Sequence, residues 1–401
     1  MKAVILAAGE GSRMRPLTYS RPKVMVSVAN KPILEHLLDE ARQAGITEFI
    51  FIVGYCDEQV RGYFGSGEKW GVNITYRNQR KQLGTADAIR AVENMVDGSF
   101  LVINGDILVS HDDISKVAGN DSATISVVKV ERTAGLGMVE MEEGKVVRIY
   151  EKTVRSPGTM ANAGMYLFTP DIFAAIADTP KSPRGEYEIT DSLQLMIDQS
   201  QEGVVCQEIS HWMDVSYPWD LLSLNESLLS RIEGQNLGEI ETNAVIKGVV
   251  AIGRNTVVRS GAYIVGPVAI GSDCEIGPNC YIRPGTSIGD NCHIGSAVEV
   301  KNSIIMKGSK FPHHNYVGDS VIGENCNFGA GTKIANLRLD GKEISVINQK
   351  TGRRKLGAIV GDGVETGINA SINLGCLIGN DTHIGPGAVV SGVILPGSKI
   401  Y

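Results

Sequence analysis

A glycine-rich turn near the N-terminus carries residues that could bind phosphate. Gly9 and Gly11 follow a short apolar run, and glycines there would let backbone N–H groups approach an anion closely. Arg13 and Arg15 come next, and guanidinium groups match the oxygens of a phosphate. The turn lacks the Gly-Lys-Ser/Thr of a P-loop, and Met14 stands where a dinucleotide fingerprint needs glycine. Taken alone, the turn could equally be a tight connection after a strand.

Three further segments strengthen the phosphate-binding interpretation. Lys23 places another cation downstream of the turn, although a lone lysine could also be a solvated surface residue. The polar loop over residues 79–86 opens a helix, and its amide side chain and backbone could contact a nucleotide base. Asp106 stands at a strand end beside Gly105, where a carboxylate suits Mg²⁺ that bridges phosphates. The alternative for Asp106 is an ordinary turn aspartate.

The elements that must position these groups follow the order strand, helix, strand. We predict strands over residues 2–8, 49–53 and 100–103, and helices over residues 32–44 and 85–96. This order implies parallel pairing with right-handed crossovers. In such sheets ligands bind beyond the carboxyl ends of the strands, and the candidate residues do follow strands. The first half is therefore predicted to be an α/β domain.

The second half follows a six-residue period. Apolar residues recur at this interval from Ile246 through Met306, resume at residue 322, and run again from Val360 to Val390. Such a period is typical of a coil with three short strands per turn. Glycine often follows the apolar residue, and we interpret these glycines as corners with positive φ. More than half of the 47 glycines lie beyond residue 240, where the chain changes character.

The cysteines and histidines of the coil are predicted to be structural. All five cysteines beyond residue 240 stand two residues before an apolar position. We favour small buried side chains over metal ligands, because their spacing follows the coil. His293 and His383 are expected to point outward. The seven cysteines of this large chain do not indicate a disulfide framework.

Composition excludes several classes of protein. With 401 residues, the chain is long enough for two domains. Its 43% hydrophobic and 21% charged residues describe a soluble globular protein. The net charge of -7 does not favour nucleic acid or anionic lipid as a partner. The N-terminus lacks the features of a signal peptide, and no apolar run is long enough to span a membrane, so we expect a cytoplasmic protein.

Residues 1 to about 230 resemble the sugar-1-phosphate nucleotidylyltransferases, through the opening motif that runs to Pro22-Lys23 and the motifs that follow. The resemblance implies a Rossmann-like nucleotidyltransferase domain in which Arg13 holds the leaving pyrophosphate and Lys23 the reacting phosphates. It places Asp106 and Asp214 on Mg²⁺, although Asp214 could also be a simple strand ending. It implies nucleotide contacts by Ala8, Gly9, Gly11, Gln79, Gly84 and Thr85, and sugar-phosphate contacts by Gly137, Glu151, Lys152 and Asn162.

The second half resembles the left-handed parallel β-helix of hexapeptide acyltransferases, which are usually trimers that bind acetyl-CoA between neighbouring prisms. Residues 307–316 break the repeat, and we predict an inserted loop there. This segment resembles the acetyltransferase loop of the bifunctional N-acetylglucosamine-1-phosphate uridyltransferase/glucosamine-1-phosphate acetyltransferase family. The resemblance makes His313 the general base; the alternative is an exposed loop histidine. It implies substrate contacts by Arg283, Lys301, Tyr316, Asn327, Asn336 and Lys355.

The chain departs from the bacterial pattern at three places, and the first of them, the second break in the repeat, suggests an archaeal-type variant. The second break, over residues 337–357, is longer than in the bacterial enzymes. Ile368 stands where the bacterial pattern has a serine near the thioester, and no arginine follows Arg354, whereas the bacterial proteins carry a basic tail that helps to hold coenzyme A. We therefore expect the acetyl-CoA site to match the bacterial enzymes less closely than the sugar site does.

The sequence thus predicts a two-domain enzyme, with a nucleotidylyltransferase domain over residues 1–232 and an acetyltransferase domain over residues 240–401. It would acetylate glucosamine 1-phosphate with acetyl-CoA and couple the product to UTP (or dTTP) with Mg²⁺, as a homotrimer or larger homo-oligomer. An amphipathic helix over residues 219–233 would bridge the two halves. One alternative is a single-activity glucose-1-phosphate pyrophosphorylase using dTTP or UTP, whose β-helix is structural or regulatory. The other is a non-enzymatic scaffold.

Overall fold

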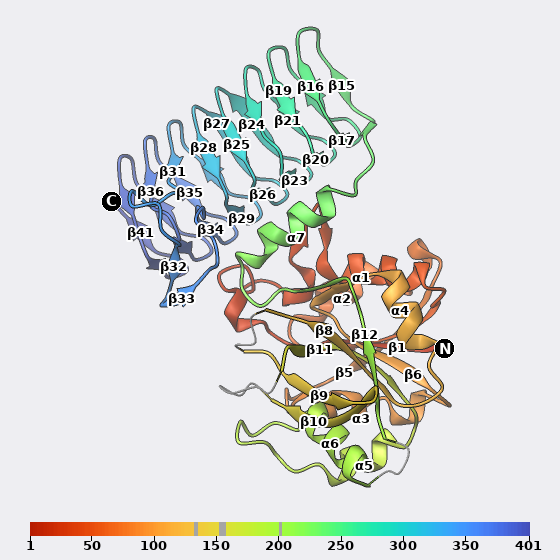
Figure 1. Ribbon diagram of the computed structural model, residues 1–401. Coiled ribbons are helices and arrows are strands. Elements are labelled where there is room, and N and C mark those ends of the chain that lie inside the picture. The colour runs from red at the N-terminus through yellow and green to blue at the C-terminus, as the bar shows by residue number, and fades with distance from the viewer. Residues whose placement is uncertain (132–134, 152–157, 200–202) are drawn as a thin grey trace. The chain divides into compact units, whose positions relative to one another are not determined.

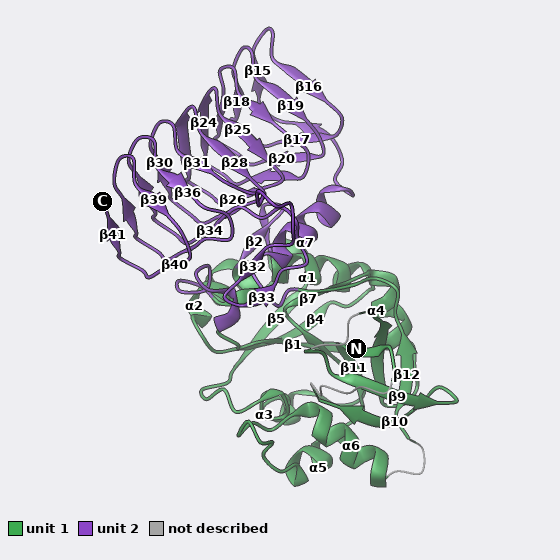
Figure 2. Cartoon of the chain, turned by 60° about the vertical axis from the view of Figure 1, so that its left-hand side comes forward, with its two compact units in different colours: residues 1–10, 22–25, 33–214 green, residues 11–21, 26–32, 215–401 purple. Residues whose placement is uncertain are grey.

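A computed structural model describes residues 1–131, 135–151, 158–199 and 203–401, and the structural statements below concern these residues (Figure 1). The chain forms two compact units (Figure 2). The first comprises residues 1–10, 22–25 and 33–214, and the second comprises residues 11–21, 26–32 and 215–401. Within the described ranges, none of the helices has the length and hydropathy that a membrane crossing needs.

The first unit is built on a nine-stranded sheet in the order β5-β4-β1-β6-β11-β8-β12-β10-β9. Strand β1 (Lys2–Ala7) pairs in parallel with β4 (Glu48–Val53) and with β6 (Phe100–Asn104). These pairings confirm the predicted strands and their parallel arrangement. The other strands are β5 (Asn73–Asn78), β8 (Thr124–Lys129), β9 (Met138–Glu142), β10 (Lys145–Tyr150), β11 (Met160–Phe168) and β12 (Val205–Glu208).

Helices cover both faces of this sheet, because its central strands are apolar on both faces. Alternate residues of β1 point to opposite sides, so that Ala3 and Ile5 pack in one core cluster and Val4 in the other. The first cluster includes residues of α1 (Ile33–Gln43), α2 (Asp57–Phe64) and α4 (His111–Ala118). The second includes residues of α3 (Thr85–Arg90), α5 (Ile172–Asp178) and α6 (Ile189–Gln199).

The helix predicted over residues 85–96 is shorter than expected. Helix α3 ends at Arg90, and a separate 3-10 turn covers Glu93–Met95. The backbone N–H groups of Ala91 and Met95 each bond to a carbonyl three residues earlier, which is the tighter 3-10 pattern. The apolar spacing extends past the point where the α-helical bonds stop.

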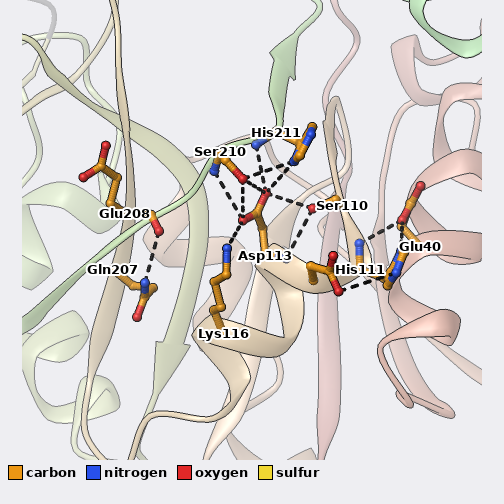
Figure 3. Close-up of polar contacts among 10 residues, drawn as sticks. Glu40, Ser110, His111, Asp113, Lys116, Gln207, Glu208, Ser210 and His211 are labelled. Atoms are coloured by element: carbon orange, nitrogen blue, oxygen red, sulfur yellow. Dashed lines mark hydrogen bonds and ion pairs between the residues drawn. The ribbon is translucent and has the colours of Figure 1, made fainter. Parts of the chain in front are cut away.

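A buried carboxylate lies at the start of α4 (Figure 3). The Asp113 side chain is fully buried and accepts hydrogen bonds from Ser110 Oγ at 2.8 Å, the His211 backbone N–H at 2.8 Å and Lys116 Nζ at 3.0 Å. Burial alone would raise the pKa of Asp113, but the hydrogen bonds and the lysine outweigh it and lower the pKa to about 2. The fold therefore stabilises the ionised form.

This lowered pKa predicts how stability changes with acid. Because the pKa of Asp113 is lower in the folded chain, its contribution is present above pH ~4 and is lost as the pH falls towards ~2. A shift of this size corresponds to about 2 kcal/mol. We expect urea denaturation to show a shallower loss of stability between pH ~5 and pH ~2 in Asp113→Asn than in the unchanged chain. If the free energy of unfolding fell equally in both proteins over this pH range, the assignment of the lowered pKa to Asp113 would be wrong.

The second unit contains a parallel β-helix. Each coil gives one short strand to each of three sheets, and equivalent residues of successive coils pair in parallel, as in Ile252, Ile270 and Ile288. Figure 1 shows this stack of short strands. The predicted coil with three strands per turn is therefore confirmed.

The strands of the coil are two to four residues long. The first sheet contains β14 (Gln235–Asn236), β17 (Val250–Ile252), β20 (Val268–Ile270), β23 (Thr286–Ile288), β26 (Ile304–Ile305), β29 (Val321–Ile322), β34 (Ile359–Val360), β37 (Leu377–Ile378) and β40 (Val393–Ile394). The second contains β15 (Glu239–Ile240), β18 (Val257–Val258), β21 (Glu275–Ile276), β24 (His293–Ser296), β27 (Lys310–His313), β30 (Asn327–Phe328), β35 (Glu365–Thr366), β38 (His383–Ile384) and β41 (Lys399–Ile400). The third contains β16 (Val245–Lys247), β19 (Tyr263–Val265), β22 (Tyr281–Ile282), β25 (Glu299–Lys301), β28 (Tyr316–Gly318), β31 (Lys333–Ile334), β36 (Ser371–Ile372) and β39 (Val389–Val390).

The first break in the repeat is not an inserted loop, and that prediction was wrong. The coil shortens by one residue, so that Ile305 and not Met306 pairs with Ile288 and joins the apolar core. Phe311 then continues the core, and residues 310–313 form β27 within the second sheet. A second shortening by one residue follows, so that Ile322 pairs with Ile305 and begins the later phase of the repeat. The break over residues 337–357 does hold an insertion, which contains the antiparallel pair β32 (Ser345–Val346) and β33 (Gln349–Lys350).

The glycines that follow the inward apolar residues have a different role from the one predicted. Gly253, Gly271, Gly289 and Gly295 do not have positive φ, although Gly277 does. A Cβ atom at Gly289 would lie 2.7 Å from the backbone nitrogen of Lys307 on the next coil. These positions need glycine because successive coils approach closely. Positive φ occurs mainly three residues before the inward position, where Asn, Asp or Gly stands.

The close approach of the coils predicts a large stability loss for Gly289→Ala. The added methyl group would collide with backbone that cannot move without separating two paired coils, so we expect a loss of about 3 kcal/mol. Gly234→Ala is the matched control, since the nearest atom to its Cβ would be 3.8 Å away. Thermal unfolding followed by circular dichroism should separate the two variants. Equal melting temperatures would argue against close packing as the reason for glycine.

The remaining predictions for the second unit agree with the structure in part. All five cysteines of the coil are buried, as expected of structural side chains. His383 is exposed, whereas His293 is only half-buried. Helix α7 (Asp220–Leu229) confirms a helix within residues 219–233, and its Asn225 side chain donates to the Gly285 carbonyl of the coil at 2.8 Å. That α7 bridges two halves stays a prediction. The unit also holds the short pair β2 (Ser27–Val28) and β3 (Lys31–Pro32).

Candidate active sites

The end of β1 meets the polar loop that precedes α3 in the first unit. The Ala8 carbonyl accepts the Tyr55 backbone N–H at 3.1 Å and Gln82 Nε2 at 3.0 Å. Gln79 is buried, and its Nε2 donates to the Gly84 carbonyl at 3.0 Å. These bonds bring Ala8, Gln79 and Gly84 together, as the nucleotide-binding prediction requires. Gln82 was not among the predicted residues, although it lies in the loop that the sequence singled out.

The structure shows why Gly84 and Thr85 stand at their positions in this loop. Gly84 has a φ of 111°, and a Cβ atom there would collide with the Tyr187 backbone, so glycine is required. Thr85 begins α3, and its Oγ1 accepts the Ile189 backbone N–H at 3.0 Å. The loop is thus fixed against the segment that enters α6.

The predicted phosphate-binding turn is divided between the two units. Gly9 belongs to the first unit, whereas Gly11 and Arg13 belong to the second. Gly11 has a φ of 72°, and its carbonyl accepts Thr18 Oγ1 at 2.9 Å, which closes the turn. The Arg13 guanidinium carbon lies 5.6 Å from the centre of the Tyr217 ring. The role of Arg13 at the leaving pyrophosphate stays a prediction.

Lys23 and the two predicted metal ligands all belong to the first unit. The Nζ of Lys23 donates to Asp106 Oδ2 at 2.6 Å, and Lys23 is only 7% exposed. Asp106 directly precedes β7 (Ile107–Val109), and Asp214 ends β13 (Trp212–Asp214). The two strands are antiparallel, and Asp214 lies opposite Ile107, the residue that follows Asp106.

Gly105 explains how Asp106 is held at the end of β1. Its backbone N–H donates to the Leu6 carbonyl at 3.0 Å, and a Cβ atom at this position would lie 2.7 Å from the same carbonyl. Any larger residue would push Asp106 away from β1. The glycine beside the carboxylate is therefore a packing requirement.

The donor set at this place fits Mg²⁺. Two carboxylates, from Asp214 and from the residue before its ladder partner, would fill only some of the coordination positions of Mg²⁺, which prefers phosphate oxygens and water to a cage built only from protein. The bond from Lys23 shows that Asp106 already accepts a cationic partner. Among the described residues, no group of three or more His, Cys, Asp or Glu side chains forms a self-sufficient metal site. Asp106 and Asp214 would need substrate to complete the coordination.

The predicted sugar-binding residues also meet in the first unit. The Asn162 backbone N–H donates to the Gly137 carbonyl at 2.9 Å, and a Cβ atom at Gly137 would lie 3.3 Å from Glu151 Oε2. The Asn162 side chain donates to the Tyr166 hydroxyl at 2.8 Å. Burial raises the pKa of this tyrosine, so its hydroxyl stays neutral. Lys152 lies outside the described residues.

Sequence reasoning missed two partners of Glu151. Arg184 donates to Glu151 Oε1 at 3.1 Å and to Glu188 Oε1 at 2.7 Å, while Thr190 Oγ1 donates to Glu151 Oε2 at 3.3 Å. Burial raises the pKa of Glu188, and the neighbouring Glu151 adds to this while Arg184 opposes it. No motif marks Arg184; the acidic residues around it were the only available sign.

A second polar cluster lies on one corner of the β-helix. The buried carboxylate of Asp319 accepts Lys301 Nζ at 2.9 Å and Asn336 Nδ2 at 2.6 Å. Asn336 Nδ2 also lies 3.2 Å from the Tyr316 hydroxyl. Three residues predicted to bind the amino-sugar phosphate therefore meet around a residue that the sequence did not reveal. Lys355 is joined to this corner through its bridge to Leu337.

The other predicted residues of this half lie nearby in the coil but not in one contact network. Arg283 donates to Glu299 on the next coil at 2.9 Å. His313 is the exposed last residue of β27, on the side of the coil that adjoins the strand of Tyr316. Asn327 pairs with Lys310, three residues before His313, so the structure does not place it directly beside the histidine.

Comparisons with known proteins agree with both halves. The family described as nucleotidyl transferase matches residues 2–231, and the GMPPB C-terminal domain matches residues 264–353. The bifunctional protein GlmU of Methanococcus maripaludis strain S2 is 39% identical and covers 100% of this chain and 97% of the relative. The bifunctional sugar-1-phosphate nucleotidylyltransferase/acetyltransferase of Sulfurisphaera tokodaii is 41% identical, over 98% of this chain and 97% of the relative.

A solved structure supports the nucleotidyltransferase fold. A crystal structure described as that of a glucose-1-phosphate thymidylyltransferase from Bacillus anthracis has a TM-score of 0.53 and 29% identity, and it covers 59% of this chain and 98% of that one. The full-length relatives extend the likeness to the β-helix. The chain is therefore a transferase, and it belongs to the family of bifunctional sugar-1-phosphate nucleotidylyltransferases/acetyltransferases.

Proposed function

We propose that this enzyme makes UDP-N-acetylglucosamine in two steps, with acetyl transfer by the residues of the β-helix and uridylyl transfer by those of the α/β domain. The domains would span residues 1–232 and 240–401. The observation that carries the proposal is the cluster of Lys301, Tyr316 and Asn336 around Asp319. A buried charged group costs free energy, and a coil that served only for assembly would be at least as stable with apolar residues there.

In the first step, the amine of glucosamine 1-phosphate attacks the carbonyl carbon of acetyl-CoA. A C–N bond forms, the C–S bond breaks, and coenzyme A leaves as a thiolate that finally takes up the proton lost by the amine. His313 would accept the proton from the amine, because an imidazole can act as a general base near neutral pH. The sugar phosphate would be held by Arg283, Lys301, Tyr316 and Lys355, and the sugar and acetyl groups by Asn327 and Asn336.

In the second step, a phosphate oxygen of N-acetylglucosamine 1-phosphate attacks the α-phosphorus of UTP, and pyrophosphate leaves. Positioning and charge neutralisation dominate such reactions. Mg²⁺ held by Asp106 and Asp214 would neutralise negative charge on the phosphates. Lys23 would bind the reacting phosphates, and Arg13 the leaving pyrophosphate. The loop of Gln79, Gly84 and Thr85 would hold the nucleotide together with Ala8, Gly9 and Gly11.

The sugar would lie against Gly137, Glu151 and Asn162, which the structure brings together, and Lys152 would bind its phosphate. Glu151 is already oriented by Arg184 and Thr190, so its carboxylate could accept sugar hydroxyls without rearrangement. We further propose a left-handed coil, a homotrimer or larger homo-oligomer, and a cytoplasmic location where these substrates are made.

The test is to incubate the full chain with glucosamine 1-phosphate, acetyl-CoA, UTP and Mg²⁺, and to follow thiol release and pyrophosphate release separately. We expect both, with thiol release independent of UTP. A parallel reaction with glucose 1-phosphate and either dTTP or UTP tests the single-activity alternative. Pyrophosphate from that reaction together with no thiol release in the first would overturn the proposal.

A further inference from the structure

The proposed metal ligands lie at one end of a two-stranded sheet, with Asp214 in β13 and Asp106 directly before β7. Among the described residues, β7 and β13 pair with each other alone, through three residue pairs that run from Trp212 opposite Val109 to Asp214 opposite Ile107. A two-stranded pairing of this length has little stability of its own. A slip of one residue would also turn each side chain of β13 to the opposite face. Some contact outside the ladder must therefore fix its register.

Asp113 lies where such a contact is needed. Strand β7 ends at Val109, Ser110 caps α4, and Asp113 stands in the first turn of that helix. On the other side, residues 210 and 211 lead directly into β13. The buried carboxylate thus lies between the exit of one strand and the entry of the other.

The hydrogen bonds of Asp113 join these two segments, as Figure 3 shows. Its oxygens accept the backbone N–H of Ser210 at 3.3 Å, the Ser210 hydroxyl at 3.2 Å and the backbone N–H of His211 at 2.8 Å. Ser110 Oγ and Lys116 Nζ complete the set from the side of α4. Bonds to backbone N–H groups fix the position of the chain itself, and these two immediately precede β13.

We propose that Asp113 is a positioning residue for the proposed Mg²⁺ site: it locks the register of β13 against β7 and so keeps Asp214 beside Asp106. This inference rests on the proposed uridylyl transfer. The Trp212 indole, which donates to the Ala163 carbonyl at 2.9 Å, fixes the orientation of β13, while the bonds to Asp113 fix its position along β7.

The inference is tested by metal binding to the full chain in the variant Asp113→Asn. The backbone N–H groups of residues 210 and 211 bond to different oxygens of Asp113. An asparagine keeps only one acceptor oxygen, so its amide nitrogen would face one of these two N–H groups and that hydrogen bond would be lost. The probe is Mn²⁺ in the presence of UDP-N-acetylglucosamine, with free Mn²⁺ measured by electron paramagnetic resonance. We expect binding that is about tenfold weaker, as is typical when a residue that orients metal ligands is lost. Thiol release should be unchanged.

Glu40→Gln is the matched control. Glu40 accepts the His111 backbone N–H at 2.8 Å, so it ties the same turn of α4 to α1 but does not touch the segment before β13. This variant should lose some stability and keep the Mn²⁺ affinity of the unchanged chain. If Asp113→Asn does not fold, Ser210→Ala removes one side-chain donor and should still weaken Mn²⁺ binding by a smaller factor.

Three outcomes are distinguishable. Weaker Mn²⁺ binding in the folded Asp113 or Ser210 variant, with Glu40→Gln unchanged, supports the inference. A folded variant that binds Mn²⁺ as tightly as the unchanged chain overturns it. If the wild-type protein neither binds Mn²⁺ in the presence of the nucleotide sugar nor releases pyrophosphate, the proposed uridylyl transfer itself is refuted.

Discussion

Replacing His313 by alanine is expected to slow thiol release from acetyl-CoA by about 10²–10⁴-fold. Pyrophosphate release from UTP and ready-made N-acetylglucosamine 1-phosphate should continue at its normal rate. The reason is chemical: a protonated amine product must lose its proton as the C–N bond forms, and the proposed site offers His313 for that task. The measurement is a thiol assay and a pyrophosphate assay on the same protein sample.

The position of His313 makes this variant informative. It is the last residue of β27 and is exposed, so its loss leaves no cavity in the coil core. His314→Asn is the matched control, because His314 has a φ of 54°, which asparagine tolerates better than alanine does. We expect this neighbour to retain thiol release. Normal thiol release in His313→Ala would exclude the histidine as the base, and loss of both activities would contradict independent sites.

The α/β domain could be predicted largely because its strands are buried on both faces. The apolar run of β1 and the spacing of α1 leave little choice of structure, and the parallel order follows from their sequence. The end of α3 could not be predicted, since Val92 and Val96 continue the apolar spacing past the last helical bond. Apolar periodicity indicates which side chains are buried, but it does not show where the backbone changes from α-helical to 3-10 hydrogen bonding.

The β-helix shows a second limit of the same kind. Ile304, Ile305 and Met306 are all apolar and all buried, so the six-residue period cannot show which of them faces the core. In the structure it is Ile305 that faces the core, because Ile305 pairs with Ile288 of the preceding coil. The loop prediction failed because two sides that are each one residue short look, in the sequence, like an inserted segment. The role of glycine was misjudged because contact between coils joins residues 18 apart, as in Gly253 and Gly271.

The candidate sites contain some residues that the sequence singled out and others that it did not. Lys23, Asp106 and Asp214 could be selected as candidates because they follow strands or lie in a recognisable motif, and two of them share a hydrogen bond in the structure. Asp319 and Arg184 belong to no motif, and their importance comes only from partners distant in the sequence. Residues predicted to contact substrate can be recognised by type and position, whereas the residues that hold them in place can be recognised only from the fold.

Replacing Asp106 by alanine is the second large effect that we expect. Pyrophosphate release should fall by at least about 10²-fold, the loss typical when one group that stabilises transition-state charge is removed. Thiol release should be unchanged. The effect has two sources: the proposed Mg²⁺ loses one of its two protein ligands, and the nearly buried Lys23 loses the carboxylate that accepts its bond at 2.6 Å. Steady-state pyrophosphate and thiol assays measure the two activities.

Asp106→Asn separates these two sources. An asparagine oxygen can still accept the bond from Lys23, whereas it is a much poorer Mg²⁺ ligand than a carboxylate. We therefore expect Asp106→Ala to lose stability because Lys23 is left without its carboxylate, and Asp106→Asn to lose less, with both equally poor in pyrophosphate release. Asp97→Ala, at a side chain that is 94% exposed, is the control. If Asp106→Asn kept full activity, the carboxylate would matter only as the partner of Lys23, and the metal site would have to lie elsewhere.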